Sequence, residues 1–221
     1  MIQPPSSEQE LMQRAQTLCG KTLQQVAQSL GYSVPPSQRH AKGWVGDIME
    51  HTLGATAASL SEPDFQALGI ELKTLPIGAN NQPRESTYVC TVPLQNNLNI
   101  NWETSNVKRK LTKVLWVPVE ADKDIPLAKR RIGKPFLWQP DPEQEAILRN
   151  DWQEIMDLIC MGELDRVSSH LGKYLQVRPK AANAKALTES ATESGEIGLT
   201  LPRGYYLRAT FTNMLFQQYS R

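Results

Sequence analysis

The chain has 221 residues, of which 40% are hydrophobic and 21% are charged, and its formal net charge is +1 at pH 7. This composition is typical of a soluble globular protein, and the length fits one large domain or two closely packed lobes. Cys19, Cys90 and Cys160 form no CxxC pattern, which argues for reduced thiols and against a disulfide framework or a zinc site. No signal peptide and no apolar run long enough to cross a bilayer are visible, so we expect a cytoplasmic protein that does not contact a membrane.

Charged residues are distributed unevenly along the chain. The segment from Ser105 to Lys134 contains nine Lys or Arg residues and three acidic residues, whereas the segment from Asp141 to Asp165 contains eight acidic residues and one Arg. The net charge of +1 gives no global signature of nucleic-acid binding, but this separation suits one polyanion-facing surface and one acidic outer surface. Solvated helix faces without a partner would give the same pattern.

Two short helices are expected to open the fold. Ser7-x-x-Glu10 has the form of a capping box, and Gly20 follows the apolar residues of that helix. Thr22-x-x-Gln25 begins a second helix that ends at Gly31. A third helix is expected from residue 42 to residue 53, after a polar loop that contains prolines.

Three strands are predicted in the middle of the chain, at residues 70–75, 87–92 and 114–119. The segment 78–83 between the first two resembles a turn, so these two strands are expected to pair as a hairpin. Pro118 lacks a backbone N–H, so the third strand is expected to lie at a sheet edge or to end there.

Helices and strands are also expected to alternate in the second half of the chain. Residues 143–161 predict an amphipathic helix whose acidic residues face outward and whose inward residues are Ala146, Ile147, Ile155, Leu158 and Ile159. The elements expected after it are a strand (174–177), an Ala-rich helix (181–188), a mobile polar loop (188–198), a strand or hairpin arm (199–207) and a closing helix (211–219). The alternation predicts a mixed α/β domain with a mixed sheet.

The main functional pattern is Asp64 followed, seven positions later, by Glu71-x-Lys73 in an apolar run. Side chains of a strand alternate between faces, so Glu71 and Lys73 share one face. Charged groups on a core strand are costly unless something pairs with them, and a divalent metal held by Asp64 and Glu71 would do so. In a metal-dependent phosphodiesterase, carboxylate oxygens bind Mg²⁺, and the metal and an ammonium group stabilise charge on the phosphate. A solvated edge strand is the alternative, because short patterns of this kind also occur by chance.

Two features upstream could extend such a site. Glu50 lies on the helix before the strand, where it could join the metal site or orient a water, and the alternative is an exposed helix carboxylate. Lys42-Gly43-Trp44 at a helix start offers free backbone N–H groups and a cation, which suits a phosphate.

The chain resembles the MutH family of mismatch-repair endonucleases, within the restriction-endonuclease-like nuclease group. The resemblance covers nearly the whole chain and is far more specific than the Asp…Glu-x-Lys pattern, because several matching blocks are long and idiosyncratic. The matching blocks are Lys42-Gly43-Trp44 with Gly46 and Glu50, Asp64 to Thr74, Trp102 to Ser105, Val114 to Glu120, Arg178 to Thr188, and Leu201 to Leu207.

The resemblance implies a monomeric, Mg²⁺-dependent endonuclease that recognises GATC in hemimethylated double-stranded DNA. It implies that the unmethylated strand is nicked on the 5′ side of the G after activation by MutL, which mismatch-bound MutS recruits. The implied fold is a mixed β-sheet flanked by helices, with two lobes forming a DNA-binding cleft. Within a single nuclease domain (1–221), the N-terminal lobe (about 1–105) would carry the metal site and the C-terminal lobe (about 106–221) DNA recognition.

Roles in catalysis follow from the same resemblance. Asp64 and Glu71 correspond to metal ligands, helped by the backbone carbonyl of Leu72. Lys73 corresponds to the catalytic lysine, which either binds the attacking water or stabilises charge in the transition state. Glu50 is expected to support the metal site.

DNA contacts are likewise implied, at residues Lys42, Gly43, Lys110, Arg178, Pro179, Lys180 and Tyr206. Arg178 is expected to read guanine in the major groove, and a phosphate clamp is its alternative role. Tyr206 is expected to sense adenine methylation, although the adjacent Tyr205 offers a second phenol. The basic cluster Lys108, Arg109, Lys110 and Lys113 is expected to contact phosphates.

Two other functions remain open from the sequence. A GATC-cutting type II restriction endonuclease usually needs two cutting centres, and the single copy of Asp64…Lys73 favours nicking instead. A non-catalytic DNA-binding protein would use the acidic residues only structurally, and the complete set of Asp, Glu and Lys argues against it.

Overall fold

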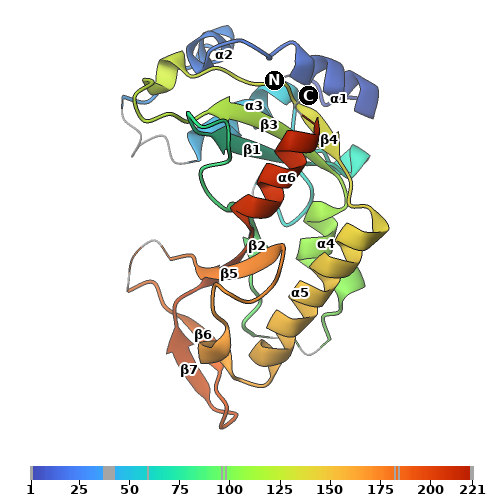
Figure 1. Cartoon of the computed structure of the whole chain (residues 1–221), viewed down its shortest axis with the longest axis vertical. Helices are drawn as coiled ribbons and strands as arrows, with labels where there is room; N and C mark the ends of the chain where they lie inside the picture. The colour runs from blue at the N-terminus through green and yellow to red at the C-terminus, as the bar shows by residue number, and fades with distance from the viewer. Residues whose placement is uncertain are drawn as a thin grey trace. The chain divides into compact units, whose positions relative to one another are not determined.

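The structure is a computed structural model that describes residues 2–36, 43–58, 60–95, 97, 99–181, 183 and 185–219. Lys42, where the sequence predicts a DNA contact, lies outside the described residues. The helices are α1 (Glu8–Gln16), α2 (Leu23–Ser29), α3 (Trp44–Leu53), α4 (Asn106–Leu111), α5 (Pro142–Cys160) and α6 (Ala209–Tyr219) (Figure 1). The strands are β1 (Glu71–Ile77), β2 (Thr87–Thr91), β3 (Val114–Glu120), β4 (Phe136–Trp138), β5 (Leu175–Pro179), β6 (Thr188–Ala191), β7 (Ile197–Thr200) and β8 (Arg203–Leu207).

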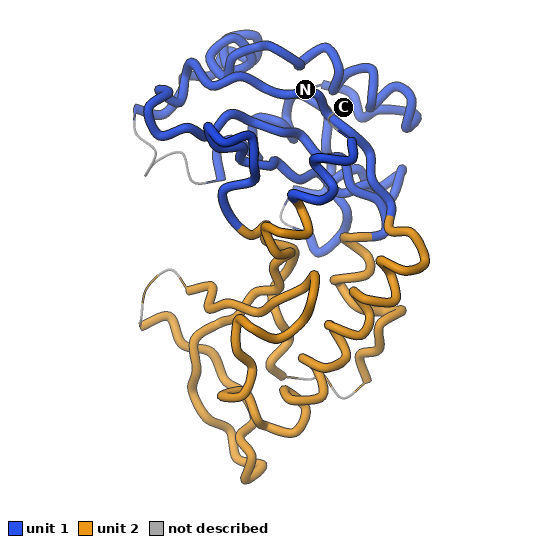
Figure 2. Tube along the Cα trace, in the orientation of Figure 1, with its two compact units in different colours: residues 1–85, 112–139, 213–221 blue, residues 86–111, 140–212 orange. Residues whose placement is uncertain are grey.

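The chain divides into two compact units, each built from segments that are far apart in the sequence. Unit 1 comprises residues 1–85, 112–139 and 213–221, and unit 2 comprises residues 86–111 and 140–212 (Figure 2). These units do not coincide with the halves 1–105 and 106–221 expected from the sequence, because the chain passes between the units more than once.

Unit 1 contains a three-stranded mixed sheet, as the sequence predicts. The strand order is β1-β3-β4, with β1 parallel to β3 and β4 antiparallel to it. Apolar residues of α1, α2 and α3 form one buried cluster with β1 and β3, including Leu11, Val26 and Met49 from the helices and Leu72 and Leu115 from the strands. The helices therefore cover one face of this sheet.

The predicted caps of the first helices are largely confirmed. The Ser7 side chain accepts from the N–H of Glu10 at the start of α1. The Glu10 carboxylate accepts from the N–H and hydroxyl of Ser6 rather than completing a box with Ser7. Thr22 and Gln25 form the complete capping box of α2.

The predicted hairpin between the first two strands is wrong. A turn does form after β1, because the N–H of Gly78 donates to the carbonyl of Gln82 and that of Arg84 donates to the carbonyl of Pro76. However, β1 pairs with β3 in unit 1, and β2 pairs with β8 in unit 2. Because β3 is apolar and buried along nearly its whole length, it takes the central position in its sheet.

Pro118 is correspondingly not at a sheet edge but in the central strand β3. Its carbonyl accepts from the N–H of Gly133 at 2.8 Å, so its ring nitrogen faces the same side. Strand β4 pairs with β3 only from Val114 to Trp116. The missing N–H of Pro118 therefore faces Gly133, outside the residues that β4 pairs and away from β1, so the β1–β3 ladder does not need it.

Unit 2 contains an antiparallel sheet with the order β2-β8-β5 and a separate β6–β7 hairpin. This hairpin replaces the predicted loop over 188–198, because Thr192 and Glu196 close a tight turn in which Gly195 has a φ of 82°. The predicted helix over 181–188 is also wrong, since none of the described residues in that range is helical. The side chain of Asn183 instead accepts from the N–H of Lys185, a local bond that competes with helix formation.

Helix α5 is confirmed, but its buried face differs from the predicted one. It begins at a capping box formed by Asp141 and Gln144. Ile155 and Ile159 are buried as predicted, whereas Ala146 is exposed and Trp152 is buried. Within the described part of the chain, no helix has the length and apolar character needed to cross a bilayer.

Asp151 is an exception to the outward-facing acidic residues of α5. Its carboxylate is buried and accepts from the backbone N–H groups of Lys173, Tyr174 and Leu175 at 2.6–2.8 Å. The three bonds tie the start of β5 to α5, because a carboxylate can accept several N–H groups at once.

We expect Asp151→Ala to lower the free energy of unfolding by roughly 2–4 kcal/mol, because one buried and two partly buried N–H groups would lose a charged acceptor. Urea denaturation would measure the change. Asp157→Ala, on an exposed position of the same helix, is the matched control and should change stability by less than about 0.5 kcal/mol. Equal losses in the two variants would contradict this role of Asp151.

Candidate active site

Asp64 and Glu71 are brought together by a tight turn at the start of β1. Phe65 and Ile70 form an antiparallel bridge, and a 3-10 turn ending at Gly69 (φ 64°) connects them. Asp64 and Glu71 are the next residues outward on the two arms, so they lie opposite each other. The seven positions between Asp64 and Glu71 in the sequence therefore form a single tight turn that sets the two acids side by side.

The backbone of Leu72 faces the same edge of the sheet as Asp64. Its N–H donates to Oδ2 of Asp64 at 2.8 Å, and β1 is an outer strand. Because the N–H and C=O of one strand residue point to the same side, the Leu72 carbonyl also faces this edge. The two carboxylates and this carbonyl are thus the oxygen donors that the sequence predicts for a metal.

Lys73 lies beside Glu71 on the face of β1 opposite the Leu72 side chain. Its Nζ atom is 2.5 Å from Oε1 of Glu71. Both side chains are largely buried, with exposed fractions of 13% for Lys73 and 2% for Glu71. The two charged groups are therefore held in one geometry with little access to bulk water.

Glu50 contributes a third carboxylate from α3. Burial of the Glu50 side chain, together with the carboxylates of Asp64, Asp47 and Glu71, raises its pKa from 4.5 to about 7, and Lys73 partly offsets the shift. The alternative of a solvated helix carboxylate is thus disfavoured, because an exposed Glu would not feel Asp64 and Glu71 in this way. Asp64, Glu71, Glu50 and Lys73, four of the predicted site residues, share one electrostatic environment.

This donor set fits a hard divalent cation. Three acidic groups and one ammonium group leave an excess of negative charge at the edge of β1, which a cation would neutralise. Among the described residues, no three His, Cys, Asp or Glu side chains converge as a ready metal cage. Mg²⁺ does not need such a cage, because it is commonly held by one or two carboxylates and keeps several waters.

A second set of predicted residues lies on one face of the β2-β8-β5 sheet in unit 2. Tyr206 pairs across the strands with Tyr88 on one side and Gln176 on the other. Arg178, two residues beyond Gln176, lies on the same face, and its Nη1 donates to Oγ of Ser86 at 2.8 Å. The structure therefore brings Tyr206 and Arg178 together, as the resemblance implies.

Tyr88 is a residue of this face that the sequence does not single out. The ring centroids of Tyr88 and Tyr206 are 5.4 Å apart in an edge-to-face arrangement. Nζ of Lys180 lies 3.2 Å from the centroid of the Tyr88 ring. Gly204 makes this contact possible, since a Cβ there would lie 2.9 Å from the Tyr88 ring. Only the pairing of β2 with β8 reveals Tyr88, because no local pattern connects these two segments.

Tyr205 and Tyr206 are separated by the sheet. Tyr205 is 1% exposed and faces the opposite side from Tyr206, which is partly exposed. Of the two phenols that the sequence leaves open, Tyr206 is therefore the accessible one on the face with Arg178 and Lys180.

The remaining predicted DNA contacts are placed as follows. Pro179 is exposed at the end of β5, beside Arg178. Gly43 is the exposed N-cap of α3, with a φ of 86°. Lys110 lies on the short helix α4, where it is partly exposed.

Two lysines of the basic cluster form ion pairs with acidic side chains of the same chain. Lys108 forms ion pairs with Glu103 and Glu145, which raise its pKa, and Nζ of Lys113 is 2.6 Å from Oε2 of Glu8. These two lysines therefore have carboxylate partners at the surface, and contact of the cluster with phosphates stays a prediction.

Comparison with known proteins gives close relatives over the whole chain. The family model described as DNA mismatch repair enzyme MutH matches residues 53–151, which include Asp64, Glu71 and Lys73. DNA mismatch repair protein MutH of Escherichia coli O6:K15:H31 (strain 536 / UPEC) is 49% identical over 219 residues, which cover 99% of this chain and 96% of the relative. The protein of the same name from Yersinia enterocolitica serotype O:8 / biotype 1B is 50% identical over 216 residues, which cover 98% of this chain and 95% of the relative.

The pKa of Glu50 predicts a pH dependence of stability when no divalent cation is present. The folded state keeps the Glu50 proton up to about pH 7, whereas the unfolded state loses it near pH 4.5. Stability should therefore fall as the pH rises from 4.5 to about 7 and then level off. In EDTA, the stability of the unaltered protein relative to Glu50→Gln should fall by roughly 1–2 kcal/mol between pH 5 and pH 8, after allowance for solvent screening.

Urea denaturation at the two pH values measures this difference. The matched control is Glu62→Gln, on an exposed position just before Asp64, which should keep the pH dependence of the unaltered protein. If Glu50→Gln keeps that dependence too, the carboxyl of Glu50 does not interact with Asp64 and Glu71 as the structure indicates.

Proposed function

The chain belongs to the MutH family of DNA mismatch repair enzymes, and on this premise we propose that it is a Mg²⁺-dependent DNA endonuclease. In this proposal it nicks the unmethylated strand of hemimethylated GATC duplex DNA on the 5′ side of the G. Mismatch-bound MutS recruits MutL, and MutL then activates the endonuclease, which acts as a monomer.

The proposal rests on the convergence of Asp64, Glu71 and Lys73 at the edge of β1. A phosphodiester is protected from attack by its negative charge, so a nuclease must neutralise the phosphate and deprotonate a water. When bound by Asp64, Glu71 and the Leu72 carbonyl, Mg²⁺ would supply Lewis-acid chemistry at this phosphate. Glu71 also holds Lys73 in place, because Nζ of Lys73 is 2.5 Å from Oε1 of Glu71.

Each residue of this group has a distinct task in the proposed reaction. Lys73 presents an ammonium group to the phosphate or to the attacking water, and its low exposure strengthens that charge interaction. Asp64 binds the N–H of Leu72 as well, which fixes the direction of its carboxylate. Glu50 borders the group, and its pKa is raised to about 7. The carboxyl of Glu50 can therefore hold or release a proton near neutral pH.

Sequence recognition is proposed for the face formed by Arg178, Lys180 and Tyr206 in unit 2. Arg can donate two hydrogen bonds to guanine O6 and N7, and Lys180 adds positive charge beside it. The phenol of Tyr206 is large enough to contact the adenine edge, where an N6-methyl group adds bulk and removes a donor. Methylation would then weaken binding through the same contact that reads the base.

We expect Asp64→Ala and Glu71→Ala each to lower the nicking rate on hemimethylated GATC duplex by at least roughly 10³-fold, because the phosphate loses its main source of charge neutralisation. Both variants should keep duplex binding in a gel-shift assay. Millimolar Mg²⁺ should raise the melting temperature of the unaltered protein but not that of either variant, because the cation binds the folded state.

Glu62→Ala is the matched control, since this exposed acid lies two residues before Asp64 and should keep both nicking and Mg²⁺ stabilisation. Substantial nicking by Asp64→Ala would contradict the catalytic role of Asp64. Loss of nicking with unchanged Mg²⁺ stabilisation would instead remove the metal role of that residue.

Tyr206→Ser should nick more slowly but discriminate less against methylated adenine on the cut strand. The loss of one base-edge contact is worth roughly 1–3 kcal/mol, so the rate ratio of unmethylated to methylated strand should fall about tenfold or more. Nicking rates on unmethylated, hemimethylated and fully methylated GATC duplexes provide this ratio.

Tyr205→Phe is the control, because it alters the adjacent phenol on the other side of the sheet and should keep the ratio. If Tyr206→Ser loses activity in parallel on all three duplexes, Tyr206 stabilises the strand and does not sense the methyl group.

A further inference from the structure

The β6–β7 hairpin of unit 2 (Figure 1) turns an apolar face to solvent. Ile197 and Leu199 of β7 are each 70% exposed. Their cross-strand partners Ala191 and Glu189 are also exposed, and because side chains of a strand alternate, all four lie on one face. The other face is small and polar, and its residues are buried or partly buried: Thr188, Ser190, Gly198 and Thr200.

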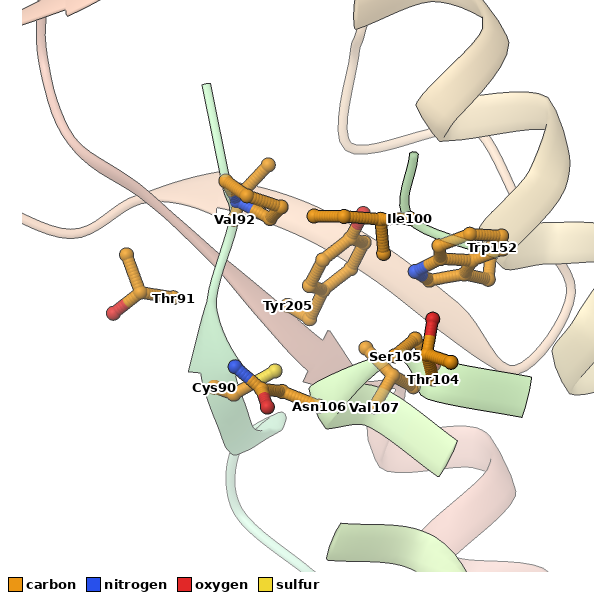
Figure 3. A pocket seen from close by; sticks show the side chains of 11 residues that line it. Cys90, Thr91, Val92, Ile100, Thr104, Ser105, Asn106, Val107, Trp152 and Tyr205 are labelled. Carbon is orange, nitrogen blue, oxygen red and sulfur yellow. The ribbon is translucent and has the colours of Figure 1, made fainter. Parts of the chain in front are cut away.

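This arrangement is the reverse of that in an ordinary packed sheet. When one side of an antiparallel sheet is solvated, its apolar residues normally face the core and its polar residues face water. The β2-β8-β5 sheet of the same unit follows that rule, since Tyr205, Val107 and Trp152 line the pocket in Figure 3 and are nearly fully buried. Neighbouring exposed apolar side chains mark an interaction surface, whereas scattered ones do not.

The same two residues of β7 also present unpaired backbone groups. The N–H of Thr192 donates to the carbonyl of Glu196, so these residues form a hydrogen-bonded pair. Bonded and non-bonded pairs alternate along an antiparallel ladder, so Ile197 and Leu199 direct their N–H and C=O groups away from β6. No other described residue bonds to these groups, because β6 is the sole strand paired with β7 there.

This outer edge of β7 lacks the usual protection against pairing with another chain. Exposed edges commonly carry a charged residue, a Pro or a bulge. β7 has the sequence Ile-Gly-Leu-Thr, without a charge or a Pro, and its register with β6 is continuous. An extended peptide can add to such an edge through main-chain hydrogen bonds, and its alternate side chains then continue the face of the sheet.

The charge around β7 indicates which partner fits. An open hollow of about 680 Å³ borders the hairpin, and its charged residues are three acids and one base: Glu163, Asp165, Glu193 and Arg166. The base is already paired with Glu163. Residues 188–200 themselves contain three Glu and no Lys or Arg. This charge would repel DNA phosphates and the same face of a second copy, whereas it would attract Lys or Arg.

The face is also too small to hold two copies of this chain together. Strands β6 and β7 have four residues each, which span about 13 Å. A stable protein–protein interface buries roughly 800 Å² on each partner. One added strand, by contrast, needs only the length of β7.

We propose that the outer edge of β7 binds an extended segment of a protein partner in which apolar side chains alternate with Lys or Arg. The segment pairs with the outward N–H and C=O groups of Ile197 and Leu199. Its apolar side chains extend the exposed face of the hairpin, and its basic side chains enter the acidic hollow beside it. The proposed nuclease reaction does not require this edge.

Binding is tested on the full chain with a short synthetic peptide in which Val and Lys alternate. A Val–Glu peptide reverses its charge, and a Ser–Lys peptide removes its apolar side chains. Fluorescence anisotropy should show saturable submillimolar binding of the Val–Lys peptide and at least roughly tenfold weaker binding of the other two. The ¹⁵N amide signals of β7 should shift with the same constant. No saturable binding of the Val–Lys peptide, or equal binding of either control peptide, overturns the proposal.

Two variants of Leu199 locate the peptide. Leu199→Pro removes an outward N–H without removing a bond to β6, and Leu199→Thr keeps the N–H but removes the apolar side chain. Each should weaken the Val–Lys peptide about fivefold or more. Leu60→Thr, on an exposed leucine of unit 1, is the matched control and should keep the affinity of the unaltered protein. Unaltered binding by Leu199→Thr, whose substituted side chain is largely in solvent, overturns the proposal.

The same amide signals test the two other occupants. Duplex DNA alone, and rising concentrations of the protein alone, should leave the signals of Ile197 and Leu199 unchanged. A saturable shift with DNA would place nucleic acid at this edge, and a concentration-dependent shift would place a second copy there. Either result overturns the proposal. The peptide titrations contain no DNA and no Mg²⁺, so a failure of the nicking proposal leaves their result intact.

Discussion

The bridge between Phe65 and Ile70 is the constraint on which the proposed active site depends. It places Asp64 opposite Glu71 and allows Asp64 to bind the N–H of Leu72 at 2.8 Å. Carboxylates held this close repel each other, and burial together with this repulsion raises the pKa of Glu50. Lys73 balances part of the charge, and a divalent cation would balance the rest. The net negative charge of this group is well suited to a cation.

The face proposed for sequence reading depends on a different kind of constraint. Its residues come from β2, β5 and β8, and only strand register brings Tyr88, Tyr206 and Arg178 to one side of the sheet. Gly204 leaves the space in which the two tyrosine rings meet, and Asp151 anchors the beginning of β5 through three N–H groups. Residues that need not touch a substrate thus determine where Arg178 and Tyr206 are presented.

Local patterns in the sequence were sufficient where the structure is local. The cap at Ser7 and the capping box of α2 both join residues three positions apart, and the sequence predicts both positions. The predictions that failed concern segments in which a neighbouring segment and a distant one compete as pairing partners. Segment 78–83 forms a turn, yet β1 joins β3 because that apolar strand gives it a buried partner. The polar segment 188–198 forms a hairpin although its composition is typical of a loop.

The sequence by itself determined the acid and lysine set of the proposed site, the mixed sheet that carries it and the family of the protein. These depend on residue types at short spacing and on long matching blocks, both of which are properties of the chain alone. Only the tertiary structure decided that Tyr205 is buried and Tyr206 accessible, that Tyr88 joins Arg178 and Lys180, and that Asp151 faces inward. Each of these depends on strand register or helix rotation, which the packing of distant segments sets when it buries the most apolar surface.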